Sequence, residues 1–562
     1  MKSRNSKLFF IILMITSQFI VSNLNSNKKQ NIPRIVILEC NKNEKPSFCY
    51  FIDKKIKNYI TQLTNKSNRI LDSEFNVTCN METMIFTGYN LFILKKTHLD
   101  NMSYRDIFLM ATDLEGKIIL KKDLGSSRFG GALDVEFINS TTILTAKPEG
   151  VAIWNLFSNN FIELGIQGHH EYEYNYSNHT LLTLDEIKHN MNGKEYQFDK
   201  IVEYNISTRK IIWELDTSSF VDPDQWCPHQ DLTQTGLPDI THCNTIFFDD
   251  EEDVFYLNAR NLNTFYKISH KTGEIIWGLG EYGNFTLYDR FGGQRNNLFY
   301  HAHAVEKVDD NTFILFDNDY HNQSNSLNQR SQILEITIDE TTMTANESWS
   351  WTAPLQYYSG FVSDADRLPN GNRLGVFGTE RHPYTDIGPR LVEVNDKGQI
   401  VWEMNFPHSE EFLFEIYRAD RFYLSPILNI PSDIIVLHTN IATVCWNTWY
   451  NFRNKNKFPG NFCLYLNDTI IETGSFFFKP FWRPTDLIFK LKNLRIGTYN
   501  LTLSVSNEAG HIITDSINIT VRSDQNLNKD LITKNKKRVP LSFFTLIIGI
   551  FILTVWLRRN KN

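Results

Sequence analysis

The sequence lacks the features that mark several large classes of proteins. Its formal net charge is only −7 over 562 residues. No basic stripe is interleaved with aromatic residues, which argues against a nucleic-acid partner. No glycine loop for phosphate, serine nucleophile elbow or paired-acid signature stands out. No helical period runs between the strand-like segments, which argues against an α/β fold. An all-β protein remains, and its chemistry must come from other side chains.

Cysteine is sparse, at seven residues in the whole chain. Two pairs are close enough in sequence for local disulfide bonds, Cys227 with Cys243 and Cys445 with Cys463. The other three, whose pairing the spacing does not reveal and of which one is left over, are Cys40, Cys49 and Cys79. The sequence therefore predicts at least two disulfide bonds in an oxidising compartment.

Long apolar runs are confined to the two ends of the chain. Leu8–Val21 follows basic residues, which is typical of a secretory signal peptide over residues 1–26, with an uncleaved membrane anchor as the alternative. Near the other end, residues 540–557 are apolar and about long enough to span a bilayer. The basic tail 558–562 suits a cytoplasmic stop-transfer signal. We expect an extracytoplasmic body at the cell surface, held to the membrane by one transmembrane helix.

Two other features fit that topology. Residues 523–539, between the body and the apolar run, are polar and charged, as expected of a stalk. N-x-S/T sequons recur along the body and predict a glycoprotein. Examples are Asn76, Asn139, Asn205, Asn284, Asn346 and Asn518.

Aromatic residues are plentiful, at 13%, and gather with Val and Ile in short runs that favour strands. One pattern recurs, in which an apolar strand, a turn and a second strand, often with Trp, follow one another. Its copies lie at 110–120, 151–164, 202–215, 266–279, 334–351 and 391–404. Between them, further hairpins begin at Asp134, His170, His242, His303 and Asp364. Each unit of the repeat thus holds two hairpins.

Two hairpins per unit make a four-stranded antiparallel blade, and about six such units predict a six-bladed β-propeller over residues 91–428. Residues 27–90 form a strand-rich segment leading into it. The copy before Thr112 is weak, so an eight-bladed or split propeller remains an alternative. From 429 to 522, two cysteines and a tryptophan in a run of alternating strands predict a small immunoglobulin-like β-sandwich.

Three histidines occupy equivalent places in the repeat, at the start of the first strand of a unit. They are His170, His242 and His303, and equivalent strands of a propeller converge at one mouth of its channel. Any one of them alone is more simply a structural residue, but three in register favour a functional site. Asn244 shares a strand face with His242, two residues on. Arg260 ends the next strand of the same unit.

The chemistry of this set is open to more than one interpretation. The guanidinium of Arg260 suits a tetrahedral oxyanion such as sulfate or phosphate, or a carboxylate, although it could also form only a salt bridge. Clustered histidines can hold zinc or copper, which would indicate a metal-dependent hydrolase. An arginine directed at the cluster would repel a cation, so we expect no metal and no other cofactor there.

Four segments carry a family resemblance, and YRADRF near residue 420 adds to it. They begin DITHCNTIFF at 239, FYHAHAVEKV at 299, SDADRLPNGN at 363 and VEVNDKGQIV at 392. They resemble the arylsulfotransferases, arylsulfate sulfotransferases that do not use 3′-phosphoadenylyl sulfate. The resemblance covers roughly residues 120–425, and its most specific part is the spacing of His242, Asn244 and Arg260. It implies a six-bladed propeller and no nucleotide cofactor.

The resemblance also implies roles for individual residues. His303, which stands before Phe316, Asp317 and Asn318, takes the place of the catalytic histidine. His170, His242, Asn244 and Arg260 match the family's other channel residues. The chain departs from the family at Ala304, where members have an aspartate that could orient the imidazole.

The resulting hypothesis is an enzyme that transfers a sulfuryl group from a phenolic sulfate ester to another phenol through a sulfohistidine. His303 would attack sulfur. Arg260, Asn244 and His242 would stabilise the charge on the sulfuryl oxygens. His170 or His242 would protonate the leaving phenolate. The alternative is a non-catalytic, membrane-anchored propeller that serves as a receptor or adhesion protein.

Overall fold

The computed structural model describes the chain from Phe75 to Arg522. The gaps in this range are residues 102–103, 128–133, 157, 226, 228–232, 234–235, 322–328, 379–387, 407–408, 410, 430–435 and 438–440. The predicted signal peptide, stalk, membrane helix and tail, and residues 27–74 of segment 27–90, lie outside the described residues. Within the described ranges, no helix has the length and apolar character needed to cross a membrane.

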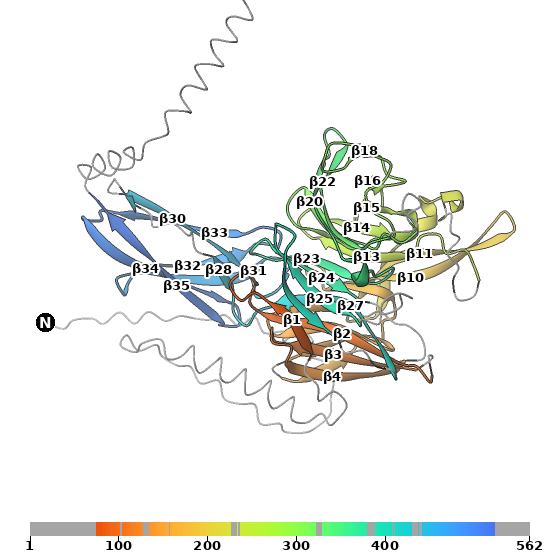
Figure 1. Ribbon diagram of the computed structural model, residues 1–562, viewed down its shortest axis with the longest axis horizontal. Helices are drawn as coiled ribbons and strands as arrows, with labels where there is room; N and C mark the ends of the chain where they lie inside the picture. The colour runs from red at the N-terminus through yellow and green to blue at the C-terminus, as the bar shows by residue number, and fades with distance from the viewer. Residues whose placement is uncertain are drawn as a thin grey trace, which may run out of the picture. The chain divides into compact units, whose positions relative to one another are not determined.

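The described part of the chain is all-β, as predicted, and its strands form eight sheets (Figure 1). Its helices are single 3-10 turns. They are η1 (Thr217–Ser219), η2 (Pro223–Gln225), η3 (Arg260–Leu262) and η5 (Leu355–Tyr357).

Six of the sheets are built on four antiparallel strands each, hydrogen-bonded in a regular order. The first is β27 (Phe412–Phe422), β2 (Tyr89–His98), β3 (Arg105–Thr112) and β4 (Ile118–Ser127). The second is β5 (Val135–Asn139), β6 (Thr142–Lys147), β7 (Gly150–Asn155) and β8 (Asn160–Glu163). The third is β9 (His169–Asn175), β10 (Thr180–Met191), β11 (Lys194–Asn205) and β12 (Lys210–Asp216).

The remaining three continue the same order along the chain. The fourth is β13 (Cys243–Asp249), β14 (Val254–Ala259), β15 (Thr264–Ser269) and β16 (Ile275–Gly280). The fifth is β19 (His303–Lys307), β20 (Thr312–Asp317), β21 (Gln332–Asp339) and β22 (Thr344–Thr352), extended by β17 (Thr286–Tyr288) and β18 (Gln294–Arg295). The sixth is β23 (Asp364–Arg367), β24 (Arg373–Phe377), β25 (Arg390–Val394) and β26 (Ile400–Asn405), extended by β1 (Asn76–Asn80).

The hairpins predicted from the repeat are confirmed. Every copy of the recurring pattern forms the last two of the four regular strands of a sheet, such as β3–β4 or β15–β16. The weak copy before Thr112 also has an explanation. The first strand of that sheet is β27, from the far end of this region, and it pairs antiparallel with β2 (teal beside orange in Figure 1). Because β27 and β2 are far apart in sequence, no turn joins them, and the repeat pattern is missing at this place.

The central strands are buried on both faces. Every residue of β13, β14 and β20 is buried, including polar ones such as Asn244 and Asn258, so exposure does not alternate along these strands. Aromatic rings fill the space between neighbouring sheets. Tyr256 of the fourth sheet packs edge-on against Phe313 of the fifth at a centroid distance of 4.8 Å. Such pairs add about 1 kcal/mol beyond the apolar area they bury.

The C-terminal region forms two more sheets. One is β28 (Ile427–Asn429), β30 (Ile441–Trp449) and β33 (Thr485–Lys492). The other is β29 (Val436–Leu437), β35 (Ile512–Val521), β34 (Gly497–Asn507), β31 (Phe458–Leu466) and β32 (Thr469–Phe478). Along β33, buried and exposed residues alternate strictly, so one face of that sheet is covered and the other is not. Trp446 of β30 and Leu464 of β31 belong to one buried cluster, which the two sheets share.

The segment between β30 and β31 carries two cations to the acidic inner strands of the six-sheet region. Arg453 pairs with Glu306 and Asp366, and Lys455 pairs with Glu173. The Lys455 Nζ atom also lies 3.8 Å from an oxygen of Glu136. Next to them, the ring of Phe452 stacks on Phe137 at 4.8 Å and 17°. These charged side chains are largely buried, so the ion pairs are shielded from water.

Both predicted disulfide bonds are wrong, because none of the five described cysteines forms a disulfide bond. Cys227 faces two histidine rings, whereas Cys243 lies in a core cluster with its backbone N–H donated to Asp199 at 2.6 Å. Cys445 and Cys463 lie in strands of different sheets, β30 and β31. The cysteines of each pair are close in sequence, but their thiol groups do not face each other. Cys40 and Cys49 lie outside the described residues.

Candidate active site

The strand starts hold the residues that the repeat placed in register. Asp134 and His242 directly precede β5 and β13, His170 is the second residue of β9, and His303 and Asp364 open β19 and β23. His170 and His242 adopt left-handed backbone conformations, with φ of 62° and 43°. Such a conformation costs a non-glycine residue about 1–3 kcal/mol and is common at functional sites. The same local kink thus recurs in two adjacent sheets.

The structure brings the three predicted histidines together. β13 packs beside β9 on one side and β19 on the other. The ring centroids of His170 and His242 lie 5.0 Å apart, at an interplanar angle of 74°. The ring of Tyr417, on β27, lies 5.9 Å from His170 and 5.9 Å from His303. Tyr417 therefore sits between two of the three imidazoles.

The environment of His303 determines which ring nitrogen carries its proton. His303 is buried, and its Nδ1 atom lies 2.7 Å from Oδ1 of Asn318. The Nδ2 group of Asn318 donates to the backbone oxygens of Ser359 at 2.8 Å and Val362 at 3.0 Å, which fixes the amide orientation. Oδ1 is then an acceptor, so Nδ1 of His303 is the donor. In the neutral ring, Nε2 is left with its lone pair.

Two effects keep His303 neutral. Burial is the larger and the positive charge of Arg260 is the next, and together they hold the pKa of His303 well below its ordinary value, despite the bond to Asn318. A buried imidazole loses more by becoming charged than one in water, and a nearby cation adds to that cost. The imidazole of His303 is therefore uncharged at neutral pH.

His170 has the complementary protonation. Burial, followed by the charge of His169, keeps the pKa of His170 well below its ordinary value. Nε2 of His169 lies 3.2 Å from Asp199, and although burial opposes it, this carboxylate raises the pKa of His169. The Nδ1 atoms of His169 and His170 are 2.6 Å apart, so one of them must donate. The raised pKa of His169 and the lowered pKa of His170 favour His169 as the donor, which leaves the proton of neutral His170 on Nε2.

His242 is partly exposed, with 34% of its side chain accessible, whereas His303 is buried. Its Nδ1 atom lies 2.6 Å from the carboxylate of Asp239. Because a carboxylate accepts, Nδ1–H is directed at Asp239 and Nε2 is presented elsewhere. The site therefore offers three imidazoles that differ in protonation or in exposure.

Arg260 and Asn244, the two predicted polar residues, have different interactions in the site. Arg260 is buried and follows β14 directly, and its charge affects both His170 and His303. Asn244 instead uses its amide internally. Its Nδ2 group donates to the backbone oxygen of Ala302 at 2.9 Å, and Nδ2 of Asn258 donates to its Oδ1 at 2.7 Å. Asn244 thus holds the backbone one residue before His303.

Sequence reasoning missed the residues that support this set. Arg418 is buried and pairs with Glu171, the residue after His170, and its Nη2 group lies 3.3 Å from Oγ1 of Thr245. The hydroxyl of Tyr417 donates to the backbone oxygen of Asn244 at 3.2 Å. The YRADRF string contains both residues, but nothing local in it indicates that β27 returns to the first sheet. Asn318 belongs to the Phe316–Asn318 segment that identifies His303 by resemblance, and nothing in the sequence assigns it a role of its own.

The metal interpretation centred on His242 and His303 receives no geometric support. Among the described residues, the group whose nitrogen, sulfur or oxygen atoms lie close enough to share an ion contains neither of them. It consists of Cys227, His301 and His321.

Comparisons with solved structures give only distant likenesses. The CARDB domain of a Pyrococcus furiosus protein is 14% identical over 18% of this chain and 92% of its own, with a TM-score of 0.14. Pseudomonas aeruginosa periplasmic gluconolactonase is 10% identical over 58% and 100%, with a TM-score of 0.31. Kluyveromyces lactis Hsv2 is 7% identical over 59% and 99%, with a TM-score of 0.27. Scores this low bear on neither fold nor function.

No curated protein matches the chain. The family model described as Arylsulfotransferase (ASST) matches residues 21–418, well over half of the sequence. That range takes in all five predicted site residues, together with Tyr417 and Arg418. The chain belongs to the arylsulfotransferase (ASST) family.

Proposed function

We propose that the protein transfers a sulfuryl group from an aryl sulfate to a phenol through a covalent intermediate on His303. The observation that supports this most is the state of His303. It is buried and neutral, its Nδ1–H is bound to Asn318, and its Nε2 lone pair is available beside a buried arginine. An uncharged imidazole held in one tautomer is suited to nucleophilic attack.

The first half-reaction forms the intermediate. Nε2 of His303 attacks sulfur as the bond from sulfur to the aryl oxygen breaks, and the phenolate leaves with the electron pair. Nε2–H of His170 protonates that oxygen while Nδ1 of His170 takes a proton from His169, so the ring of His170 stays neutral. The second half-reaction reverses these steps. The acceptor phenol gives its proton to the same base and attacks sulfur, and the bond from sulfur to His303 breaks.

Arg260 stabilises the sulfuryl oxygens during transfer, and His242 does so only with a proton on Nε2 as well as on the Nδ1 atom that faces Asp239. The transition state is loose, as in phosphoryl transfer, so fixed positive charge and positioning contribute more than a strong base. Asn244 acts as a positioning residue, because its amide is bonded to the backbone oxygen that precedes His303. The ring of His242 is partly exposed and can meet the entering donor.

Asn318 supplies what Ala304 lacks. The family resemblance leads one to expect an aspartate beside the nucleophile. In this chain the Oδ1 atom of Asn318 accepts the imidazole proton instead, from the end of β20. Ala304 has a φ of 53°, and its backbone N–H donates to Thr245 at 3.1 Å. The backbone there is therefore fixed without an aspartate side chain.

We further propose that the six regular sheets are the blades of a six-bladed propeller, closed where β27 pairs with β2. The two C-terminal sheets would then be an immunoglobulin-like sandwich. The patterns of residues 1–26 and 540–557 support an extracytoplasmic body with a membrane anchor.

The test uses the purified full-length protein, a chromogenic aryl sulfate and a phenol acceptor. Wild type should release phenol in an acceptor-dependent way, and His303→Ala should fall to the background rate. Intact-mass measurement on the donor alone should show one added sulfuryl group, absent from His303→Ala. The matched control is His179→Asn, at an exposed hairpin position with φ of 54°, which should react like wild type. Binding without turnover would favour the receptor alternative.

A further inference from the structure

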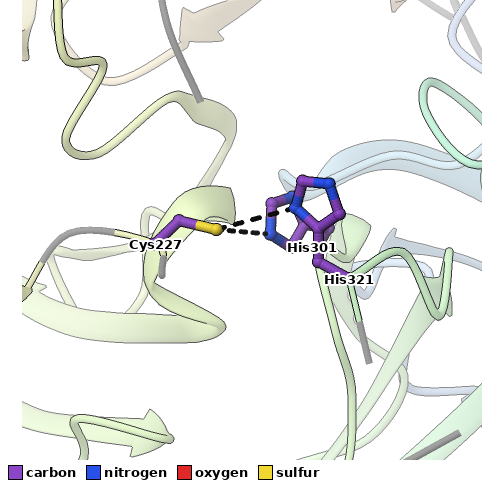
Figure 2. Close-up of side chains that lie close together, drawn as sticks. All are labelled: Cys227, His301 and His321. Carbon is purple, nitrogen blue, oxygen red and sulfur yellow. Dashed lines mark hydrogen bonds between the residues drawn. The ribbon is translucent and has the colours of Figure 1, made fainter. Parts of the chain in front are cut away.

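Cys227, His301 and His321 bring one sulfur and two imidazole nitrogens together beside the candidate active site (Figure 2). Sγ of Cys227 lies 3.6 Å from Nε2 of His301 and 3.6 Å from Nδ1 of His321. All three ligand atoms lie within 4.8 Å of one another. Cys227 and His301 are buried, and His321 is half-buried. None of the three has a part in the sulfuryl transfer proposed above.

These distances match the edges of a tetrahedral coordination shell. With zinc–sulfur and zinc–nitrogen bonds of about 2.3 and 2.05 Å at tetrahedral angles, the sulfur and nitrogen lie about 3.6 Å apart. Both observed distances have this value. Hydrogen bonds reach the same length, because the thiol can donate to one ring while its sulfur accepts an N–H from the other. One zinc ion between the three atoms gives both distances as well.

The surroundings orient both imidazoles. The ring of Tyr320 stacks on His321 at 3.7 Å and 29°, and meets His301 edge-on at 5.5 Å and 82°. The backbone N–H of His301 donates to Oδ1 of Asn263 at 2.8 Å. Rings held by their neighbours lose little freedom on binding an ion, which favours affinity.

The charge of the site is compatible with Arg260 nearby. That guanidinium lies 5.8 Å from the ring centroid of Tyr320, the residue that stacks on His321. Neutral imidazole is the form that binds a metal. Because a coordinated thiol is deprotonated, Cys227 would cancel one of the two charges of a divalent ion.

We propose that Cys227, His301 and His321 bind one zinc ion through Sγ, Nε2 and Nδ1. The mixed sulfur and nitrogen set is the kind that zinc prefers over magnesium or calcium. The ion ties together three separate segments: the one after η2, the turn two residues before His303, and the turn after β20. It stabilises the rim of the site without entering the transfer reaction.

The first experiment measures metal in the full-length protein, purified without chelator, by elemental analysis. We expect about one zinc per chain in wild type, as in structural zinc sites, and background zinc in Cys227→Ser and His321→Ala. The control is Cys445→Ser, which changes a free thiol in β30 and should keep its zinc. Equal zinc in Cys227→Ser and wild type would overturn the proposal, and copper in place of zinc would overturn the choice of ion.

The second experiment needs no variant, so it holds if a substitution prevents folding. Wild type is stripped with a chelator and titrated with cobalt, which should give a sulfur-to-cobalt charge-transfer band that added zinc removes. Bound zinc should also protect Cys227 from alkylation, located by peptide mass. No band, together with equal alkylation with and without zinc, would leave only a thiol hydrogen bond and overturn the proposal. Neither readout depends on aryl sulfate turnover.

Discussion

Oδ1 of Asn318 lies 2.7 Å from Nδ1 of His303, and the same amide is anchored by two backbone carbonyls. The bond joins the end of the second strand of the fifth sheet to the start of its first strand, because His303 and Phe316 are paired across β19 and β20. The imidazole is therefore oriented by its own hairpin.

Asn318→Ala should slow transfer about a hundredfold in kcat, the cost of a reacting group misplaced by about 1 Å. KM should change little, because Asn318 lies behind the ring and away from the substrate. Steady-state kinetics with a chromogenic donor measure both constants. Asn160→Ala, at an exposed position in β8, is the control. An unchanged kcat in Asn318→Ala would show that the tautomer is fixed in another way.

The pH dependence of kcat/KM should show that His303 stays neutral in acid. Burial and Arg260 hold its pKa well below the ordinary value, which is about 6.5 for histidine. The rate should therefore stay level as the pH falls past that value and decline only further down. Arg260→Met should move the acid limb to higher pH, besides lowering the rate. A wild-type limb at or above the ordinary histidine pKa would contradict this account.

The lowered pKa values of His303 and His170 make the free energy of unfolding depend on pH. Between the folded and unfolded pKa values of His303 and His170, the unfolded chain binds more protons than the folded one. These residues therefore make the free energy of unfolding fall as the pH drops below about 6.5. Urea unfolding of wild type and His170→Gln at several pH values isolates the share of His170. The difference in the free energy of unfolding between wild type and His170→Gln should change with pH below about 6.5 and be constant above it.

Lys455→Met should destabilise the protein, because it leaves buried acidic groups without their cation. Lys455 pairs with Glu173 and lies 3.8 Å from Glu136. Removing one partner of a buried ion pair costs about 3 kcal/mol. Lys490→Met, on the exposed face of β33, should cost far less. Chemical denaturation of the two variants measures the difference.

This loss should be larger at pH 8 than at pH 6. Burial raises the pKa of Glu136 to about 7 even with Lys455 present. Without the lysine, this carboxyl holds its proton in the folded state and loses it in the unfolded state as the pH rises. The unfolded chain then binds fewer protons, so the free energy of unfolding falls with rising pH. A pH-independent loss would indicate that packing, rather than charge, is what Lys455 contributes.

The described cysteines should all react as thiols. Unfolding in denaturant with an alkylating reagent and no reductant should label Cys79, Cys227, Cys243, Cys445 and Cys463. A structural disulfide would contribute about 2–4 kcal/mol, so adding reductant should leave the melting temperature unchanged. Peptide mapping that finds Cys445 linked to Cys463 would contradict the structure.

The hairpins could be read from the sequence because both of their strands are local. Turn residues and alternating apolar runs lie within about 15 residues of each other, as in the pair at 266–279. β27 is different, because its partner β2 lies more than 300 residues earlier. Nothing within the Phe412–Phe422 segment specifies that pairing. The disulfide prediction failed for the related reason that closeness in sequence does not fix the direction of side chains.

The sequence by itself determined the strand repeat, the family and the identities of His170, His242, His303 and Arg260, because each of these depends on spacing along the chain. The tertiary structure alone decided the protonation and the orientation of these side chains. Burial and the neighbouring charges set the protonation of the imidazoles, and Asn318, rather than the residue after His303, orients the ring. Protonation and orientation depend on atoms brought together from distant segments, and such contacts exist only once the chain has folded.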